Sequence, residues 1–133
     1  MQLESLDLEK TRFVVEEINN YLKGELWFDF CVGKYVADEL TVYGGLSFSY
    51  PDIEIKFKGV FLISLPMLWK TATETIENGT VLTLIDDETA GKINRKFQVE
   101  VGYHLFKFTP EDYPSDFGCF ISAQEISFNI LKK

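Results

Sequence analysis

The chain has 133 residues, of which 46% are hydrophobic and 26% are charged, so we expect one soluble globular domain spanning residues 1–133 rather than a disordered or membrane-embedded chain. Its 13 basic and 21 acidic residues give a net charge of −8 at pH 7. Because nucleic acids and anionic membranes attract Lys and Arg, this charge argues against both as partners, whereas it would attract a basic protein.

The first predicted element is an amphipathic helix over residues 6–23. Its apolar stripe recurs every three or four residues and consists of Leu8, Thr11, Val15, Ile18 and Leu22. Its polar side carries Glu9, Lys10, Glu16, Glu17, Asn20 and Lys23. Gly24 follows at the position where a helix C-terminus favours a left-handed residue. We expect the apolar stripe to pack on a sheet.

Three strands joined by short turns are predicted next. The hydrophobic period changes to two in three segments, which are residues 25–35, 40–50 and 53–63. In the third segment, Ile53, Ile55 and Phe57 alternate with charged residues, which indicates a strand with one wet face. Short turns favour antiparallel pairing, so these segments predict a meander.

The second half of the chain is predicted to mix loops, strands and a short helix. Pro66 ends the third strand, and residues 67–80 are expected to form a loop around Trp69 and an Asn78-Gly79 turn. A strand over 81–85 precedes a short helix that begins at Asp86-Asp87-Glu88, because acidic residues favour a helix N-terminus. The remaining elements are a strand over 98–109, a loop over 110–117 and a strand over 119–131.

Grouped strands, with helices at the start and in the middle and without regular β-α-β alternation, indicate the α+β class. We expect an N-terminal amphipathic helix packed on a mostly antiparallel, curved β-sheet of about six strands, with a short second helix. The pattern fits an open curved sheet and a partly closed barrel equally well.

Few residues offer catalytic chemistry. His104 is the only histidine, and its place among aromatic residues on a predicted strand favours a packed side chain over a general base. Cys31 and Cys119 are too few and too far apart for a disulfide framework or a zinc site, and we expect buried free thiols. Motifs for phosphate, dinucleotide or calcium binding are absent from the sequence, as is a nucleophile elbow. We therefore expect no metal site and no cofactor, and we favour a non-enzymatic function.

A cytoplasmic location is expected. The segment Met1-Gln2-Leu3-Glu4 lacks the basic residue and apolar run of a secretory signal, and no stretch of 18 apolar residues occurs. Asn78-Gly79-Thr80 matches a glycosylation triplet but is interpreted as a turn.

Acidic side chains concentrate in two segments. Residues 71–91 contain no Lys or Arg, and residues 111–116 add further carboxylates beside aromatic residues. Aromatic rings with a charged rim are typical of protein interfaces. The candidate partner-binding residues are Trp69, Glu74, Glu77, Asp86, Asp87, Glu88, Glu111, Asp112, Tyr113 and Asp116. The alternative is a solvated loop surface with Trp69 in the core.

Short segments of the chain resemble a known family. These segments are Ile-Glu-Ile-Lys-Phe-Lys-Gly-Val at 53–60, Leu65-Pro66 and Ile121-Ser122-Ala123. Together with the leading helix and the acidic, aromatic-rich composition, they are similar to the single-domain immunity proteins of bacterial polymorphic-toxin systems. The resemblance implies a bacterial, cytoplasmic protein that binds and neutralises a toxin domain, and it assigns no site residues. Acidic loops would suit a basic nuclease as that partner.

Three hypotheses of function follow. The first is a non-enzymatic binding module whose acidic loops engage a basic protein. The second is a small-ligand-binding or enzymatic domain with a pocket between helix and sheet that uses His104, Asp29 or Cys31. The third is a homo-oligomeric structural protein that pairs through edge strands.

Overall fold

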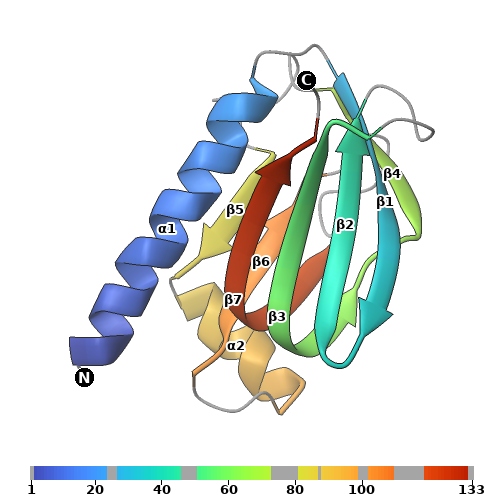
Figure 1. The fold of residues 1–133 in the computed structure, drawn as a ribbon. Helices are drawn as coiled ribbons and strands as arrows, with labels where there is room; N and C mark the ends of the chain where they lie inside the picture. Colours follow the sequence, from blue (N-terminus) through green and yellow to red (C-terminus); the bar gives the residue numbers. More distant parts are fainter. Residues whose placement is uncertain are drawn as a thin grey trace.

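The structure is a computed structural model that describes residues 2–23, 27–45, 51–72, 81–86, 88–98, 102–109 and 119–131. These residues form helices α1 (Gln2–Leu22) and α2 (Glu88–Lys96) and strands β1 (Trp27–Val36), β2 (Glu39–Gly45), β3 (Ile53–Ser64), β4 (Leu68–Ala72), β5 (Leu82–Ile85), β6 (His104–Phe108) and β7 (Phe120–Ile130). Figure 1 confirms the α+β class, with the N-terminal helix packed on a curved antiparallel sheet. The sheet has seven strands, slightly more than expected.

The strands follow the order β4-β1-β2-β3-β7-β6-β5, and every neighbouring pair is antiparallel. Strands β1, β2 and β3 form the predicted meander. Successive side chains point to opposite faces of the sheet: in β3, Ile53, Ile55 and Phe57 are buried, whereas Lys58 is exposed. Within the described residues, neither helix has the length and hydropathy of a membrane-spanning helix.

The sheet curls because β3 and β7 bend where they pair. Gly59 has a φ of 64°, a conformation that glycine adopts without the strain that other residues meet, and the β3–β7 register shifts between Val60 and Leu62. The bend brings distant strands together, so that the rings of Trp69 on β4 and Phe108 on β6 lie 5.0 Å apart. Among the described residues, no ladder joins β4 to β5, which are the two end strands of the curled sheet.

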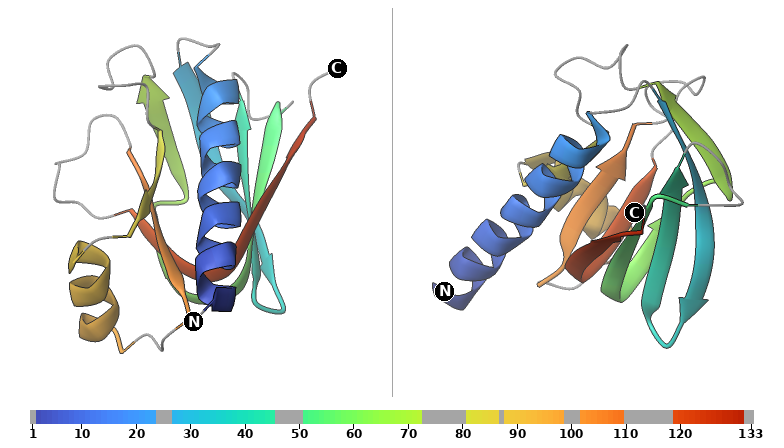
Figure 2. Two further views of the ribbon diagram at one scale, coloured as in Figure 1. Left: turned by 90° about the vertical axis from the view of Figure 1, so that its left-hand side faces the viewer. Right: turned by 45° about the horizontal axis from the view of Figure 1, so that its top comes forward.

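Helix α1 fills the open side of the curl, against β7 and β5 (Figures 1 and 2). Its residues Val15, Ile18 and Leu22 are buried in the core. The amide of Asn19 binds the β5 segment: its Oδ1 accepts hydrogen bonds from the N–H groups of Val81 and Leu82, both at 3.0 Å, and its Nδ2 donates to the Leu82 carbonyl at 2.7 Å. The helix thereby covers an edge of the sheet that would otherwise present unpaired backbone groups.

Helix α2 packs on the opposite face of the sheet from α1. Leu105 and Ser122 are buried and alternate with core residues, so they point away from the α1 side. The Ser122 hydroxyl donates a hydrogen bond to Asn94 Oδ1 of α2 at 3.1 Å. The helix begins at Glu88, where the sequence predicted an acidic helix start.

Three predicted boundaries are corrected. Helix α1 begins at Gln2 and not at residue 6. Residues 68–72 form strand β4, not part of a loop, because they pair with β1. The strand predicted over 98–109 begins only at His104, since a turn follows α2 and Gln98 has a φ of 58°. Residues 46–50, 73–80, 99–101 and 110–118 lie outside the described residues.

Candidate functional site

The structure describes three of the ten predicted partner-binding residues. Trp69 is only 3% exposed and its ring stacks on Phe30, so it is a core residue, in agreement with the alternative interpretation of its segment. Asp86 is exposed and forms an ion pair with Arg12 of α1, and Glu88 is exposed at the start of α2. The other seven, Glu74, Glu77, Asp87, Glu111, Asp112, Tyr113 and Asp116, lie outside the described residues.

The residues considered for an enzymatic site are not brought together. His104 is half-buried on β6, with its ring 6.2 Å from that of Phe106. Asp29 and Cys31 lie on β1, which three other strands separate from β6 in the sheet. Both are half-buried, and Oδ1 of Asp29 is buried without a hydrogen-bond partner among the described residues. In the ranges that the structure describes, no three His, Cys, Asp or Glu side chains gather as metal ligands.

Both cysteines are free thiols in an environment that suppresses their reactivity. Burial raises the pKa of the Cys31 thiol and of the Cys119 thiol above the ordinary range. Because the thiolate is the reactive form, a raised pKa lowers the fraction of reactive thiol at neutral pH. We predict that alkylation by iodoacetamide at pH 7.5 is at least about tenfold slower in the native protein than in urea.

The same pKa shifts predict how stability depends on pH. A thiol whose pKa is raised by folding contributes stability that is present below the pKa of the unfolded thiol and is lost as the pH rises through the folded pKa. The free energy of unfolding should therefore decrease at alkaline pH, and less steeply in Cys119→Ala. Equal alkylation rates in native and unfolded protein, or an unchanged pH dependence in the variant, would contradict this prediction.

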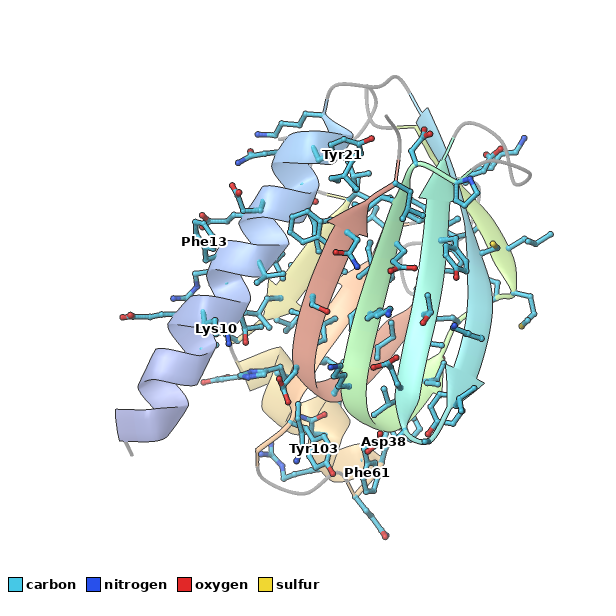
Figure 3. The ribbon with its side chains drawn as sticks, viewed as in Figure 1. Lys10, Phe13, Tyr21, Asp38, Phe61 and Tyr103 are labelled. Carbon is cyan, nitrogen blue, oxygen red and sulfur yellow. The ribbon has the colours of Figure 1, made fainter. Side chains whose placement is uncertain are left out.

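The solvent-facing side of α1 is acidic and carries an exposed aromatic ring. Residues three and four positions apart lie together on a helix, so the helix neighbours of Phe13 are three glutamates, Glu9, Glu16 and Glu17, and one lysine, Lys10. The Phe13 side chain is 61% exposed, and the three glutamates are exposed. Figure 3 shows Phe13 on the side of α1 that is turned away from the sheet. We call Phe13 and the three glutamates the acidic helix face.

The carboxylates of the acidic helix face take no part in the ion pairs formed by the described side chains. Those ion pairs join Arg12 to Asp86, Lys56 to Glu54 and Lys58 to Glu39. Arg12, which precedes Phe13, is turned towards Asp86. The face therefore presents an apolar ring beside three carboxylates and one ammonium group, with a net negative formal charge.

The sequence contained a signal for Phe13 that the pattern analysis did not use. At 3.6 residues per turn, Phe13 lies about 160° around the helix from Thr11, which belongs to the apolar stripe. A large aromatic residue at that angle is out of phase with the core. Such a residue is expected either to be an isolated exposed ring or to contact a partner.

A hollow of about 200 Å³ lies between α1 and the bend of β3 and β7. Its lining consists of Lys10, Thr11, Val14, Lys58, Glu125, Ile126 and Ser127. This is the place where the second hypothesis expected a pocket, but His104, Asp29 and Cys31 do not line it.

Comparisons of the chain with protein-family models, with curated proteins and with solved structures found no match. Function is therefore inferred from the geometry of the molecule itself.

Proposed function

We propose that this protein is a non-enzymatic binding module that engages a basic protein partner through the acidic helix face. The observation that carries the proposal is the position of Phe13, 61% exposed and beside three exposed glutamates on one helix. Exposed aromatic rings within a charged rim are typical of the residues that dominate binding energy. The net charge of −8 adds long-range attraction for a basic surface.

The rigid support of α1 favours this role. The opposite side of the helix is fixed by buried apolar residues and by the Asn19 hydrogen bonds to β5. Binding would therefore order few groups, which lowers the entropic cost of association. The complementary partner would offer an apolar pocket for the Phe13 ring, bordered by Lys or Arg side chains.

The acidic segment 71–91 supports the same assignment. Asp86, near the end of that segment, pairs with Arg12 on α1, so the segment reaches the helix that carries the acidic helix face. The resemblance to immunity proteins suggests the class of partner, a toxin domain with a basic surface, and we propose that the two meet in the bacterial cytoplasm. A nucleic acid partner is not proposed, because phosphates would be repelled.

Binding should depend on Phe13 and on salt. The immobilised protein is used to capture partners from a bacterial lysate. The captured basic protein is then purified, and its Kd for the wild type and for each variant is measured by titration. We expect Phe13→Ala to weaken its affinity at least about 30-fold, the effect of removing an interface hot spot. The double variant Glu16→Gln, Glu17→Gln should weaken binding and reduce its salt dependence.

Matched variants identify the surface. Asp38→Asn with Asp52→Asn changes the charge equally on residues outside the acidic helix face, and it should leave the affinity unchanged. The double variant Glu74→Gln, Glu77→Gln tests separately whether these two predicted carboxylates contribute to the affinity. Full affinity in Phe13→Ala, or a self-associated protein that Phe13→Ala converts to a monomer, would contradict the proposal. Co-expression of a captured toxin domain should be tolerated with the wild type and toxic with Phe13→Ala.

A further inference from the structure

The hollow between α1 and the β3–β7 bend is chemically different from the rest of this acidic protein. It is lined by two amines, from Lys10 and Lys58, and by one carboxylate, from Glu125. The formal charge of its lining is therefore positive, in a chain whose net charge is −8. It lies between helix and sheet, beside rather than on the acidic helix face.

The side chains of Lys10, Lys58 and Glu125 are exposed, so a ligand can reach them. Neither Lys10 (labelled in Figure 3) nor Glu125 takes part in the ion pairs formed by the described side chains. Lys58 is only loosely held, with its Nζ 3.9 Å from Glu39 Oε2. Lys58 and Glu125 are direct cross-strand partners on β3 and β7, so the backbone fixes their spacing.

The remaining lining adds an apolar wall and hydroxyl groups. Val14 is half-buried and packs against the core, so its side chain offers a fixed apolar surface, whereas Ile126 is a core residue only 8% exposed. Thr11 and Ser127 bring hydroxyls to the same hollow. The volume of about 200 Å³ admits a small molecule, since a cavity of about 150 Å³ accommodates benzene.

From this arrangement we infer a second binding site, for a free α-amino acid with an apolar side chain. Its carboxylate pairs with Lys10 and Lys58, its ammonium group with Glu125, and its side chain lies on Val14. Oppositely charged groups in one small hollow select a zwitterion over a simple acid or amine, because either analogue leaves one charged group without a partner. This site is independent of the proposed protein-binding function.

The test uses L-leucine and two analogues, 4-methylpentanoic acid, which lacks the amine, and 3-methylbutylamine, which lacks the carboxylate. Binding is followed by amide chemical shifts in the intact, isotope-labelled protein. We expect leucine to shift the amides of Val14 and Ile126 saturably, with a Kd in the millimolar range or tighter. Each analogue should bind at least about tenfold more weakly, the effect of losing one charge-assisted hydrogen bond.

Variants test the roles of the cationic and anionic side chains of the hollow. Lys10→Met and Glu125→Gln should each weaken leucine binding about tenfold, whereas Lys34→Met, an exposed lysine outside the lining, should not change it. All three alter exposed side chains, and circular dichroism confirms that they fold. Absence of saturable shifts with leucine would overturn the inference, as would equal binding of 4-methylpentanoic acid or full affinity in Glu125→Gln.

Discussion

Replacing Phe108 by Ala is expected to lower the free energy of unfolding by about 3–5 kcal/mol, the cost of removing a fully buried phenylalanine ring. Three rings contact Phe108, with centroids 5.0, 5.6 and 6.3 Å away in Trp69, Phe30 and Phe57. These rings come from β4, β1 and β3, whereas Phe108 belongs to β6. The substitution would therefore leave a cavity at the point where the curled sheet meets itself.

Urea denaturation followed by tryptophan fluorescence measures this effect, since the Trp69 ring is part of the cluster. A domain is stable by only about 5–15 kcal/mol, so Phe108→Leu serves as a milder variant if the alanine variant does not fold. Phe61→Ala is the matched control, because the Phe61 ring is 46% exposed and contacts Tyr103 at the surface (Figure 3). We expect the control to lose less than about 1 kcal/mol. Equal losses in Phe108→Ala and Phe61→Ala would refute the role of Phe108 in closing the curl.

The strands with strict alternation were predictable because local sequence determines which face is buried. In β3, the period of two in Ile53, Ile55 and Phe57 placed the buried side chains correctly. Strand β4 was missed because its five residues carry little pattern of their own. It is a strand through its pairing with β1, a neighbour distant in sequence, and that pairing cannot be inferred from local periodicity.

The curl itself has no local signature that fixes its extent. Gly59 permits a bend in β3, but glycine allows a bend without specifying its angle. The angle is set by the side chains that the bend brings together, above all by Trp69 and Phe108. Hydrophobic periodicity therefore does not distinguish an open sheet from a partly closed barrel.

The candidate site was predicted only in its chemistry. The sequence pointed to negative charge beside aromatic side chains, but Trp69, the aromatic residue of the predicted set that the structure describes, lies in the core. Burial depends on the partner strand and the curl, which sequence proximity to acidic residues does not reveal. Phe13 was predictable from its phase on the helix, because helical geometry is local and regular.

The two sides of α1 have separable roles, which makes the proposals testable without unfolding the protein. The inward side stabilises the fold, whereas Phe13 and its glutamates contact little of it. Substitutions on the outward side should change the free energy of unfolding by no more than about 0.5 kcal/mol. A loss of binding in Phe13→Ala would then report on the interface alone.

Asn19→Ala should be the most destabilising substitution of a polar residue on α1, with an expected loss of about 2–3 kcal/mol. The change removes three hydrogen bonds and leaves the buried Val81 and Leu82 without their Asn19 partner. An unsatisfied buried N–H or C=O group costs about 1–3 kcal/mol, and partial access of water to these groups limits the sum. Asn20→Ala, one residue later and exposed, should lose less than about 0.5 kcal/mol.

Asn19→Asp tests the mechanism rather than the size of the effect. The aspartate keeps an oxygen that accepts from the two N–H groups, but it lacks the amide hydrogen that the Leu82 carbonyl accepts. We therefore expect a loss of stability between those of the wild type and of Asn19→Ala. Hydrogen exchange should show the amides of Val81 and Leu82 protected in Asn19→Asp and unprotected in Asn19→Ala, because only the alanine variant removes their acceptor. If both amides stay protected in Asn19→Ala, other contacts hold the edge of β5, and the hydrogen bonds of Asn19 are not needed for the fold.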